Sequence, residues 1–259
     1  TADGRNLLVT HAGTHELSVI DFPAVLEKLE RLPVKLAPGQ APDFAKAANI
    51  RSEVPSDLAF LTGLRRRVRL QGNGTRALAV VGSTAWVTGY FSDSIERIDV
   101  AVREPKPVAT ALGPKVAGSD ARRGERYFND ATLCFQQWQS CATCHSYDGR
   151  VDGLNWDLLN DGIGNPKNAK SLVWAHRTPP SMSLGVRASA EVAVRAGIRF
   201  SLFAVPPEEV PAAIDAYVRR AVELVGCFFL RCTDHLPQVA DLGNKLFGGS
   251  APGQVITLG

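Results

Sequence analysis

The first part of the chain alternates between short runs of apolar, β-branched residues and polar turns. Residues 7–21 read LLVTHAGTHELSVID, and residues 85–99 read AWVTGYFSDSIERID. Each stretch has two apolar runs on either side of a polar turn, which predicts a β-hairpin. The two stretches align without a gap and end at equivalent residues, Asp21 and Asp99. A repeated hairpin predicts a stacked or radial arrangement, because one hairpin cannot bury its own apolar face.

Apolar residues at helical spacing appear in several other stretches. Residues 22–33 (FPAVLEKLERLP) predict a short amphipathic helix inserted between the hairpins, and a strand is expected within 58–70. Further along, Ser119 is a typical N-cap for a helix over residues 120–128. Residues 207–225 have an apolar face that predicts a closing helix.

This change of periodicity divides the chain into four parts. We expect β-structure over 1–110, a linker over 111–118, a helical domain over 119–226 and a tail over 227–259. Within the tail, residues 240–247 repeat an A-x-x-G-x-x-x-F pattern that is also found at 121–128. The repeat is typical of an ordinary amphipathic helix or of the start of a second helical unit.

Composition and charge narrow the class of protein. The chain is 45% hydrophobic and 21% charged, which is typical of a globular protein with a substantial core. A net charge of +3 is too small to indicate nucleic-acid binding, and no apolar run is long enough for a membrane span. His11 and His15 fall at the first predicted turn without other metal-binding side chains nearby, so we expect them at the surface.

The five residues Cys141-Ala142-Thr143-Cys144-His145 form the C-x-x-C-H pattern of covalent haem c attachment. In such a site each cysteine sulfur bonds one haem vinyl group, and His145 would be an axial ligand of the iron. A redox-active C-x-x-C and half of a zinc site are the alternatives. Zinc would need a second compact pair of ligands, which the sequence does not offer. We therefore expect one covalent haem c.

Covalent haem attachment takes place outside the bacterial cytoplasm, so we expect a periplasmic or other extracytoplasmic location. Disulfides can form in such a compartment. The remaining cysteines are Cys134, Cys227 and Cys232, and the sequence does not assign their pairing.

The sixth ligand of the iron decides what a haem at this site would do. Met182, the single methionine, lies in a Thr-Pro-Pro loop and is the favoured ligand, with His176 as the alternative. A His/Met pair suits electron transfer, whereas an open position suits peroxide chemistry. Phe128 and Trp156 are the aromatic residues expected to pack at the haem.

Both parts of the chain resemble known families. The "D-G-x-x-L-x-V-T" and "L-x-V-I-D" patterns of the hairpins resemble blades of YVTN-type β-propellers. Gly124 and Phe128 match positions in the opening helix of c-type cytochromes, where the glycine lets two helices cross closely. Residues 178–185 resemble the distal segment of bacterial di-haem cytochrome c peroxidases and MauG enzymes, in which the methionine, here Met182, binds the electron-transfer haem. The loop over 148–165 departs from that family, because it lacks the histidine that binds the peroxidatic haem.

These observations and resemblances predict a multidomain protein with a partial β-propeller of about two blades, followed by an all-α cytochrome c domain. The expected function is single-electron transfer to a redox protein partner. One alternative is a di-haem peroxidase or MauG-like oxidoreductase whose second haem lies elsewhere. Another is a non-catalytic binding module with a structural or sensory haem. Further propeller blades or a second haem unit would belong to a parent protein.

Overall fold

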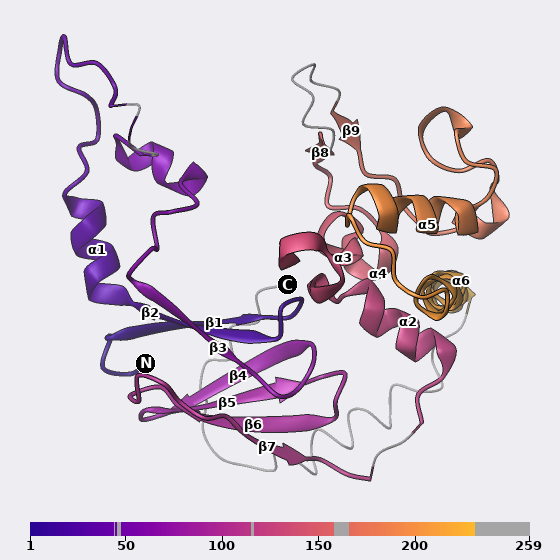
Figure 1. The fold of residues 1–259 in the computed structure, drawn as a ribbon, viewed down its shortest axis with the longest axis horizontal. Helices are drawn as coiled ribbons and strands as arrows, with labels where there is room; N and C mark the ends of the chain where they lie inside the picture. Colours follow the sequence, from indigo (N-terminus) through magenta and orange to yellow (C-terminus); the bar gives the residue numbers. More distant parts are fainter. Residues whose placement is uncertain (44, 46–47, 115–116, 158–165, 231–259) are drawn as a thin grey trace. The chain divides into compact units, whose positions relative to one another are not determined.

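The computed structural model describes residues 1–43, 45, 48–114, 117–157 and 166–230 (Figure 1). The chain divides into two compact units, Thr1–Pro114 and Lys115–Gly259, which we call unit 1 and unit 2. No helix in the described ranges combines the length and apolarity needed to cross a membrane.

Unit 1 contains two antiparallel sheets. The first has the strand order β1-β2-β3, with β1 at Asn6–His11, β2 at Glu16–Asp21 and β3 at Arg65–Arg69. The second has the order β4-β5-β6-β7, with β4 at Thr75–Val81, β5 at Thr84–Gly89, β6 at Ser94–Asp99 and β7 at Val108–Ala111. Helix α1 (Phe22–Glu30) and the 3-10 helix η1 (Arg51–Ser56) lie in the connection between β2 and β3.

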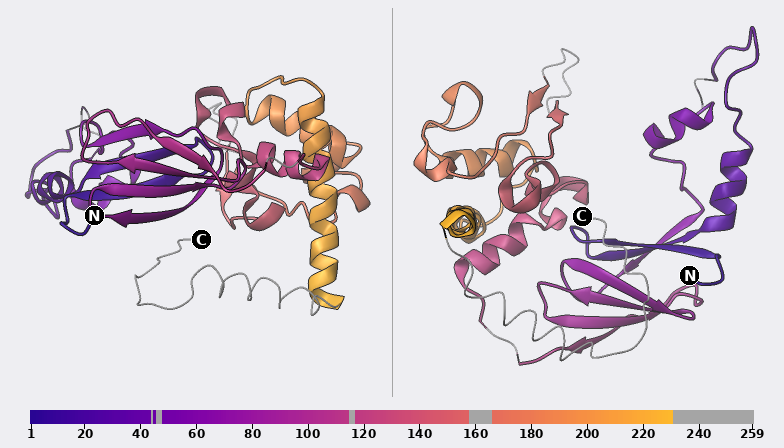
Figure 2. Two further views of the ribbon diagram at one scale, coloured as in Figure 1. Left: turned by 90° about the horizontal axis from the view of Figure 1, so that it is seen from below. Right: turned by 180° about the vertical axis from the view of Figure 1, so that it is seen from behind.

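The two predicted hairpins are present and share one register. Leu7 pairs with Ile20 in the first hairpin, and the equivalent Ala85 pairs with Ile98 in the second. Both sheets contribute inward-facing apolar residues to a single core, as alternation along a strand requires. The buried members are Leu17, Val19, Val68, Leu70, Ala85, Val87, Ile98 and Val100. Figure 2 shows the two sheets from two directions.

Unit 2 is built mainly from helices around a second core, and α6 is the longest of those described. Its α-helices are α2 (Asp120–Phe128), α3 (Cys141–Cys144), α4 (Ser146–Gly149), α5 (Ala190–Phe200) and α6 (Glu209–Leu230). The 3-10 helices are η2 (Ala131–Leu133), η3 (Phe135–Gln137), η4 (Ala175–Arg177) and η5 (Ser183–Gly185), and a two-stranded sheet joins β8 (Asn155–Trp156) to β9 (Lys167–Asn168).

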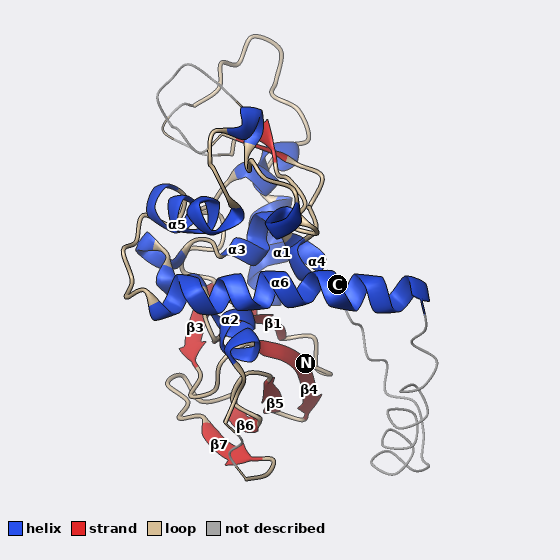
Figure 3. Cartoon of the chain, turned by 90° about the vertical axis from the view of Figure 1, so that its right-hand side faces the viewer, coloured by secondary structure: helices blue, strands red, loops and turns tan. Residues whose placement is uncertain are grey.

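Helices α2 and α6 cross in close contact (Figure 3). The Ser119 side chain accepts a hydrogen bond from the Arg122 N–H and so caps α2, as predicted. A Cβ atom at Gly124 would lie 1.8 Å from the Ala213 carbonyl oxygen, so only glycine permits this approach. The Phe128 ring packs 5.1 Å from the Tyr217 ring, between centroids, and is buried.

The predicted fold class is wrong. The described residues form three antiparallel sheets, and the β8–β9 sheet lies within unit 2, so a partial propeller followed by an all-α domain does not describe the chain. Two-residue strands carry too little periodicity to be recognised in a sequence. The tail repeat at residues 240–247 lies outside the described residues.

His15 also differs from the expectation. It is 3% exposed, and its Nδ1 accepts a hydrogen bond from the Gly74 N–H at 3.0 Å. The ring thus fixes the turn before β4 from a position in the first hairpin. His11 is half-buried and its Nε2 lies 2.7 Å from the Ser18 hydroxyl oxygen.

Candidate cofactor site around the C-x-x-C-H motif

The motif forms a single helical turn, α3, that starts after Ser140. The Thr143 hydroxyl oxygen accepts a hydrogen bond from the Ser140 N–H at 3.0 Å. The His145 N–H closes the turn by donating to the Cys141 carbonyl at 2.9 Å. Residues three apart on a helix share a face, so Cys141 and Cys144 project to the same side.

The two motif thiols lie in surroundings that disfavour ionisation. Both are free, and Cys141 packs against the core cluster that contains Phe128. Burial raises the pKa of Cys141 to about 12, and the nearby thiols of Cys144 and Cys134 act in the same direction. Burial and then the charge of Asp152 raise the pKa of Cys144 to about 11. Redox-active C-x-x-C pairs show the opposite shift, because they react as thiolates.

His145 is held in the form that binds a metal. Burial lowers its pKa, which favours the neutral imidazole that coordinates iron or zinc. Its Nδ1 is buried and has no hydrogen-bond partner among the described residues. Backbone groups of Lys170 and Arg150 also approach the ring and oppose the lowering of its pKa. Two adjacent thiols and this imidazole therefore fit a covalently attached haem.

Asp152 connects the motif to Trp156, a role that the sequence did not reveal. The Asp152 N–H donates to the Cys144 carbonyl at 3.3 Å. The Asp152 carboxylate accepts a hydrogen bond from the Trp156 indole N–H at 2.8 Å. Phe128 belongs to the core cluster against which Cys141 packs, so both predicted aromatic residues are linked to the motif.

The structure places Met182 on an exposed loop. The residue is 49% exposed, and its backbone has a φ of 68°, in the left-handed region. A Cβ atom at Gly185 would lie 2.6 Å from Pro180 Cγ, which explains why this turn needs glycine. Among the described residues, Met182 does not belong to the core cluster against which Cys141 packs.

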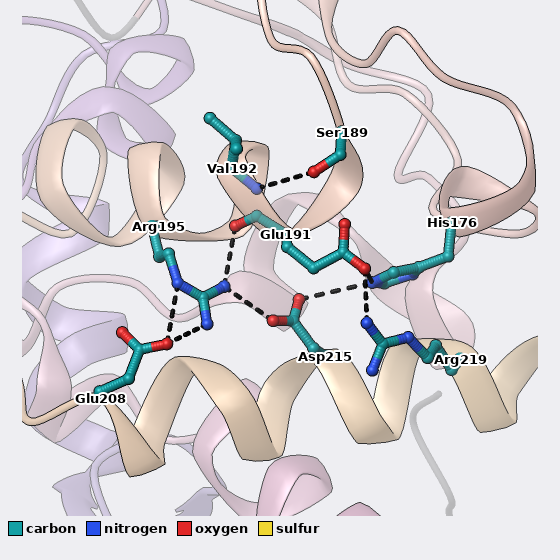
Figure 4. A network of polar contacts seen from close by, with 8 residues as sticks. All are labelled: His176, Ser189, Glu191, Val192, Arg195, Glu208, Asp215 and Arg219. Carbon is teal, nitrogen blue, oxygen red and sulfur yellow. Dashed lines mark hydrogen bonds and ion pairs between the residues drawn. The ribbon is translucent and has the colours of Figure 1, made fainter.

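His176 belongs to a buried polar network (Figure 4). Its side chain is 6% exposed, and its Nε2 lies 3.4 Å from Asp215 Oδ1 and 3.8 Å from Glu191 Oε1. Its Nδ1 is buried without a hydrogen-bond partner in the described part of the chain. Arg195 donates to the second Asp215 oxygen at 2.7 Å. Hydrogen bonds from the Glu191 backbone, from Ser189 and from Arg219 lower the pKa of Glu191 to about 2.

A zinc site is not supported by the described residues, which contain no group of three or more His, Cys, Asp or Glu side chains that could hold a metal ion. The remaining cysteines cannot be compared, because the side chain of Cys227 and the whole of Cys232 lie outside the described residues. Cys134 is buried, and its thiol donates to the Phe135 carbonyl at 3.4 Å.

The C-x-x-C-H pattern that α3 and His145 form is the pattern of haem c attachment sites. The chain is similar to hydrazine synthase subunit gamma of Kuenenia stuttgartiensis, with 31% identity over 138 residues. The match covers 49% of this chain and 38% of that relative. No protein-family model and no solved structure matches the chain.

Proposed function

We propose that unit 2 is a haem c-binding electron-transfer domain of an extracytoplasmic protein. Cys141 and Cys144 hold the haem covalently, and His145 provides the proximal nitrogen. The single observation that carries the proposal is the geometry of the motif, in which two free thiols lie on the one helical turn Cys141–Cys144 and His145 follows as its C-cap. Residues three apart share a face of the turn, so both sulfurs can reach one bound group. Burial raises the pKa of both thiols and so disfavours the thiolate form on which dithiol redox chemistry depends.

Met182 is proposed as the distal ligand, with His176 as the alternative. Two carboxylates already surround Nε2 of His176, whereas the half-exposed Met182 thioether is accessible to a bound group. A haem iron with one nitrogen and one thioether ligand exchanges single electrons at a raised potential. Around it, Phe128 would supply apolar packing, and Asp152 would hold Trp156 and the carbonyl of Cys144 in place.

Spectroscopy of the purified full chain tests this proposal. We expect haem to stay on the polypeptide under denaturing conditions and the ferric protein to show the near-infrared methionine-to-iron band. Met182→Ala should abolish the band and lower the reduction potential, while covalent haem is retained. His176→Ala should keep the band. A band that survives in Met182→Ala, or a high-spin ferric parent, would refute the His/Met assignment.

Cysteine variants test the attachment separately. The Cys141→Ser/Cys144→Ser double variant should lose covalent haem, and Cys134→Ser is the matched control because it removes a neighbouring thiol outside the motif. The control should keep its full haem content. Stoichiometric zinc in place of haem would refute the proposal.

The similarity to a subunit of hydrazine synthase favours a second candidate, in which the haem unit is part of a multisubunit oxidoreductase. The expected partner is then another protein subunit that exchanges electrons with unit 2. This candidate includes the di-haem peroxidase-like alternative with its second haem elsewhere. Rapid reduction of the haem by a co-purified subunit would support it. Steady peroxide turnover by the chain alone would instead indicate an enzyme with an open iron.

A further inference from the structure

A polar network joins the two ends of the segment that carries Met182. Its members are His176, Glu191, Arg195 and Asp215. His176 lies in η4, before that segment, and Glu191 lies in the first turn of α5, after it. Their side chains meet, with His176 Nε2 at 3.8 Å from Glu191 Oε1. Residues 177–190 therefore form a loop whose two ends are brought together by side chains.

Asp215 fixes both ends of this loop to α6. Its side chain is 4% exposed, and each carboxylate oxygen has its own partner, His176 at 3.4 Å and Arg195 at 2.7 Å. Arg195 is 36% exposed, so Asp215 is the buried member of this ion pair, and its charge would be left without compensation if its partners were removed. The carboxylate thus needs η4 and α5 in their present positions.

The outer members of the network differ from this buried centre. Glu208 bonds Arg195 from the far side and is 70% exposed, and Arg219 bonds Glu191 at 2.5 Å and is 53% exposed. Exposed ion pairs contribute little to stability. Substitutions at Glu208 or Arg219 can therefore serve as controls for substitutions at His176 or Asp215.

The loop itself offers few contacts that could fix Met182. Met182 and Leu184 have positive φ angles, and their exposed fractions are 49% and 99%. The backbone pairing of Ser181 with Arg187 closes a tight turn within the loop, and η5 spans three residues. The position of Met182 consequently depends on how the ends of the loop are held.

We propose that His176 and Asp215 are positioning residues for Met182, holding its loop against α5 and α6 so that the thioether can stay bound to iron. This inference rests on the proposed function, in which Met182 is the distal ligand. It also gives His176 a role other than that of a ligand. The buried Asp215 carboxylate gives the ends of the loop contacts that the exposed Met182 and Leu184 do not have.

Competition by imidazole tests the inference on the full, haem-loaded chain. Imidazole displaces the methionine, and the midpoint of displacement is read from the near-infrared band. Asp215→Asn should lower the midpoint on the order of tenfold, which corresponds to about 1.4 kcal/mol. Glu208→Gln, the matched control, should stay within about twofold of the parent. Hydrogen exchange of residues 177–190 should rise in Asp215→Asn alone.

The outcomes separate the inference from the proposed function. A folded Asp215→Asn protein with the parent's midpoint and exchange overturns the inference. If Asp215→Asn does not fold, His176→Ala and His176→Gln decide. The alanine variant should lower the midpoint, the glutamine variant should restore it through its amide, and equal midpoints overturn the inference. A parent without the methionine band refutes Met182 ligation and the ligand-positioning role together.

Discussion

The surroundings of the motif thiols determine how Cys141 and Cys144 react before a haem is attached. Burial dominates at both, and it raises their pKa values to about 12 and about 11. Each pH unit below the pKa lowers the thiolate fraction about tenfold, and the thiolate is the reactive form. The haem-free protein should therefore keep both groups as unreactive thiols at neutral pH.

Alkylation of the haem-free chain tests this expectation. At pH 8.5 we expect iodoacetamide to modify Cys144 roughly a hundredfold, and Cys141 roughly a thousandfold, more slowly than an unfolded peptide of the same sequence, whose thiols have pKa values of about 8.5. The rate should still be rising above pH 10. Peptide-level mass spectrometry separates Cys141 and Cys144 from the other cysteines. A plateau below pH 9 would show that the thiols are poised for redox chemistry after all.

His11 gives unit 1 a pH dependence that can be isolated. Burial is the largest cause of its lowered pKa, followed by Arg67, while Glu16 acts in the opposite direction and Arg65 lowers it further. As the pH falls below about 6.5, the unfolded chain takes up a proton that the folded state resists. The stabilisation is thus complete above that pH and is lost as the pH falls toward the folded pKa.

We expect His11→Gln to flatten the fall in the free energy of unfolding between pH 7 and pH 5. The change in slope should stay below about 1.4 kcal/mol per pH unit, which is the limit for one proton. Urea unfolding of parent and variant at several pH values measures it, and the difference cancels the other histidines. Parallel curves for the two proteins would contradict the assignment.

At the residue scale, the sequence predicts a role for the motif but not the contacts around it. Cys141, Cys144 and His145 were singled out by a local pattern, and their role as haem-attachment residues stays a prediction. The roles of Asp152 and His15 depend on contacts with residues that other elements bring close. The carboxylate of Asp152 resembles any solvated turn acid until β8 places Trp156 against it. Contacts of this kind cannot be predicted from the residue at a single position, because they depend on how distant segments pack.

At the element scale, the crossing of α2 and α6 depends on one missing side chain. A Cβ atom at Gly124 would lie 1.8 Å from the oxygen and 2.5 Å from the carbon of the Ala213 carbonyl. These are backbone atoms of α6, so they move only if the helices separate. We expect Gly124→Ala to destabilise unit 2 by about 1–3 kcal/mol, despite the better helix propensity of alanine.

Gly197 is the matched control for this substitution. It lies within α5, and a Cβ atom there would meet no atom within 4 Å. Gly197→Ala should therefore stabilise unit 2 by about 0.5–1 kcal/mol through helix propensity alone. Chemical unfolding followed by far-ultraviolet circular dichroism, which reports the loss of helix, compares the two variants. Equal effects of the two alanines would mean that the close crossing is not required.

The elements that the sequence predicted well are those marked by a local pattern, such as a capping residue before a helix or a polar turn between two apolar runs. Helix α2 begins where Ser119 caps it, and the repeated hairpins pair in the predicted way. The strand expected within 58–70 is reduced to β3, because backbone hydrogen bonds form turns just before it. The β8–β9 sheet, which overturned the all-α expectation, is too short to leave a periodic pattern.

At the scale of the whole molecule, the two units have separate hydrophobic cores. The core of unit 1 includes Ile98, and the core of unit 2 includes Phe128 and Ile214, with no residue in common. Apolar periodicity indicates which face of an element is buried, but the partner of that face is set by tertiary packing. For this reason the sequence predicted the hairpins and helices better than the way in which they pack together.

Because the cores are separate, we expect a core substitution in one unit to leave the stability of the other unit unchanged. Two buried isoleucines, one in each unit, form a matched pair for this test. Ile98 is 0% exposed in unit 1 and Ile214 is 1% exposed in unit 2. Truncation of either to alanine should cost about 2–5 kcal/mol, because it removes buried methyl groups and leaves a cavity. Ile98→Ala should lower the stability of unit 1, measured by hydrogen exchange in β5 and β6, without changing hydrogen exchange in α2 and α6. Ile214→Ala should raise exchange in α2 and α6, lower the thermal midpoint of unit 2 by on the order of 10 °C and leave exchange in unit 1 unchanged. If each variant instead weakened both units equally, unit 2 would depend on unit 1 for its stability, and the proposed function of unit 2 would need the whole chain.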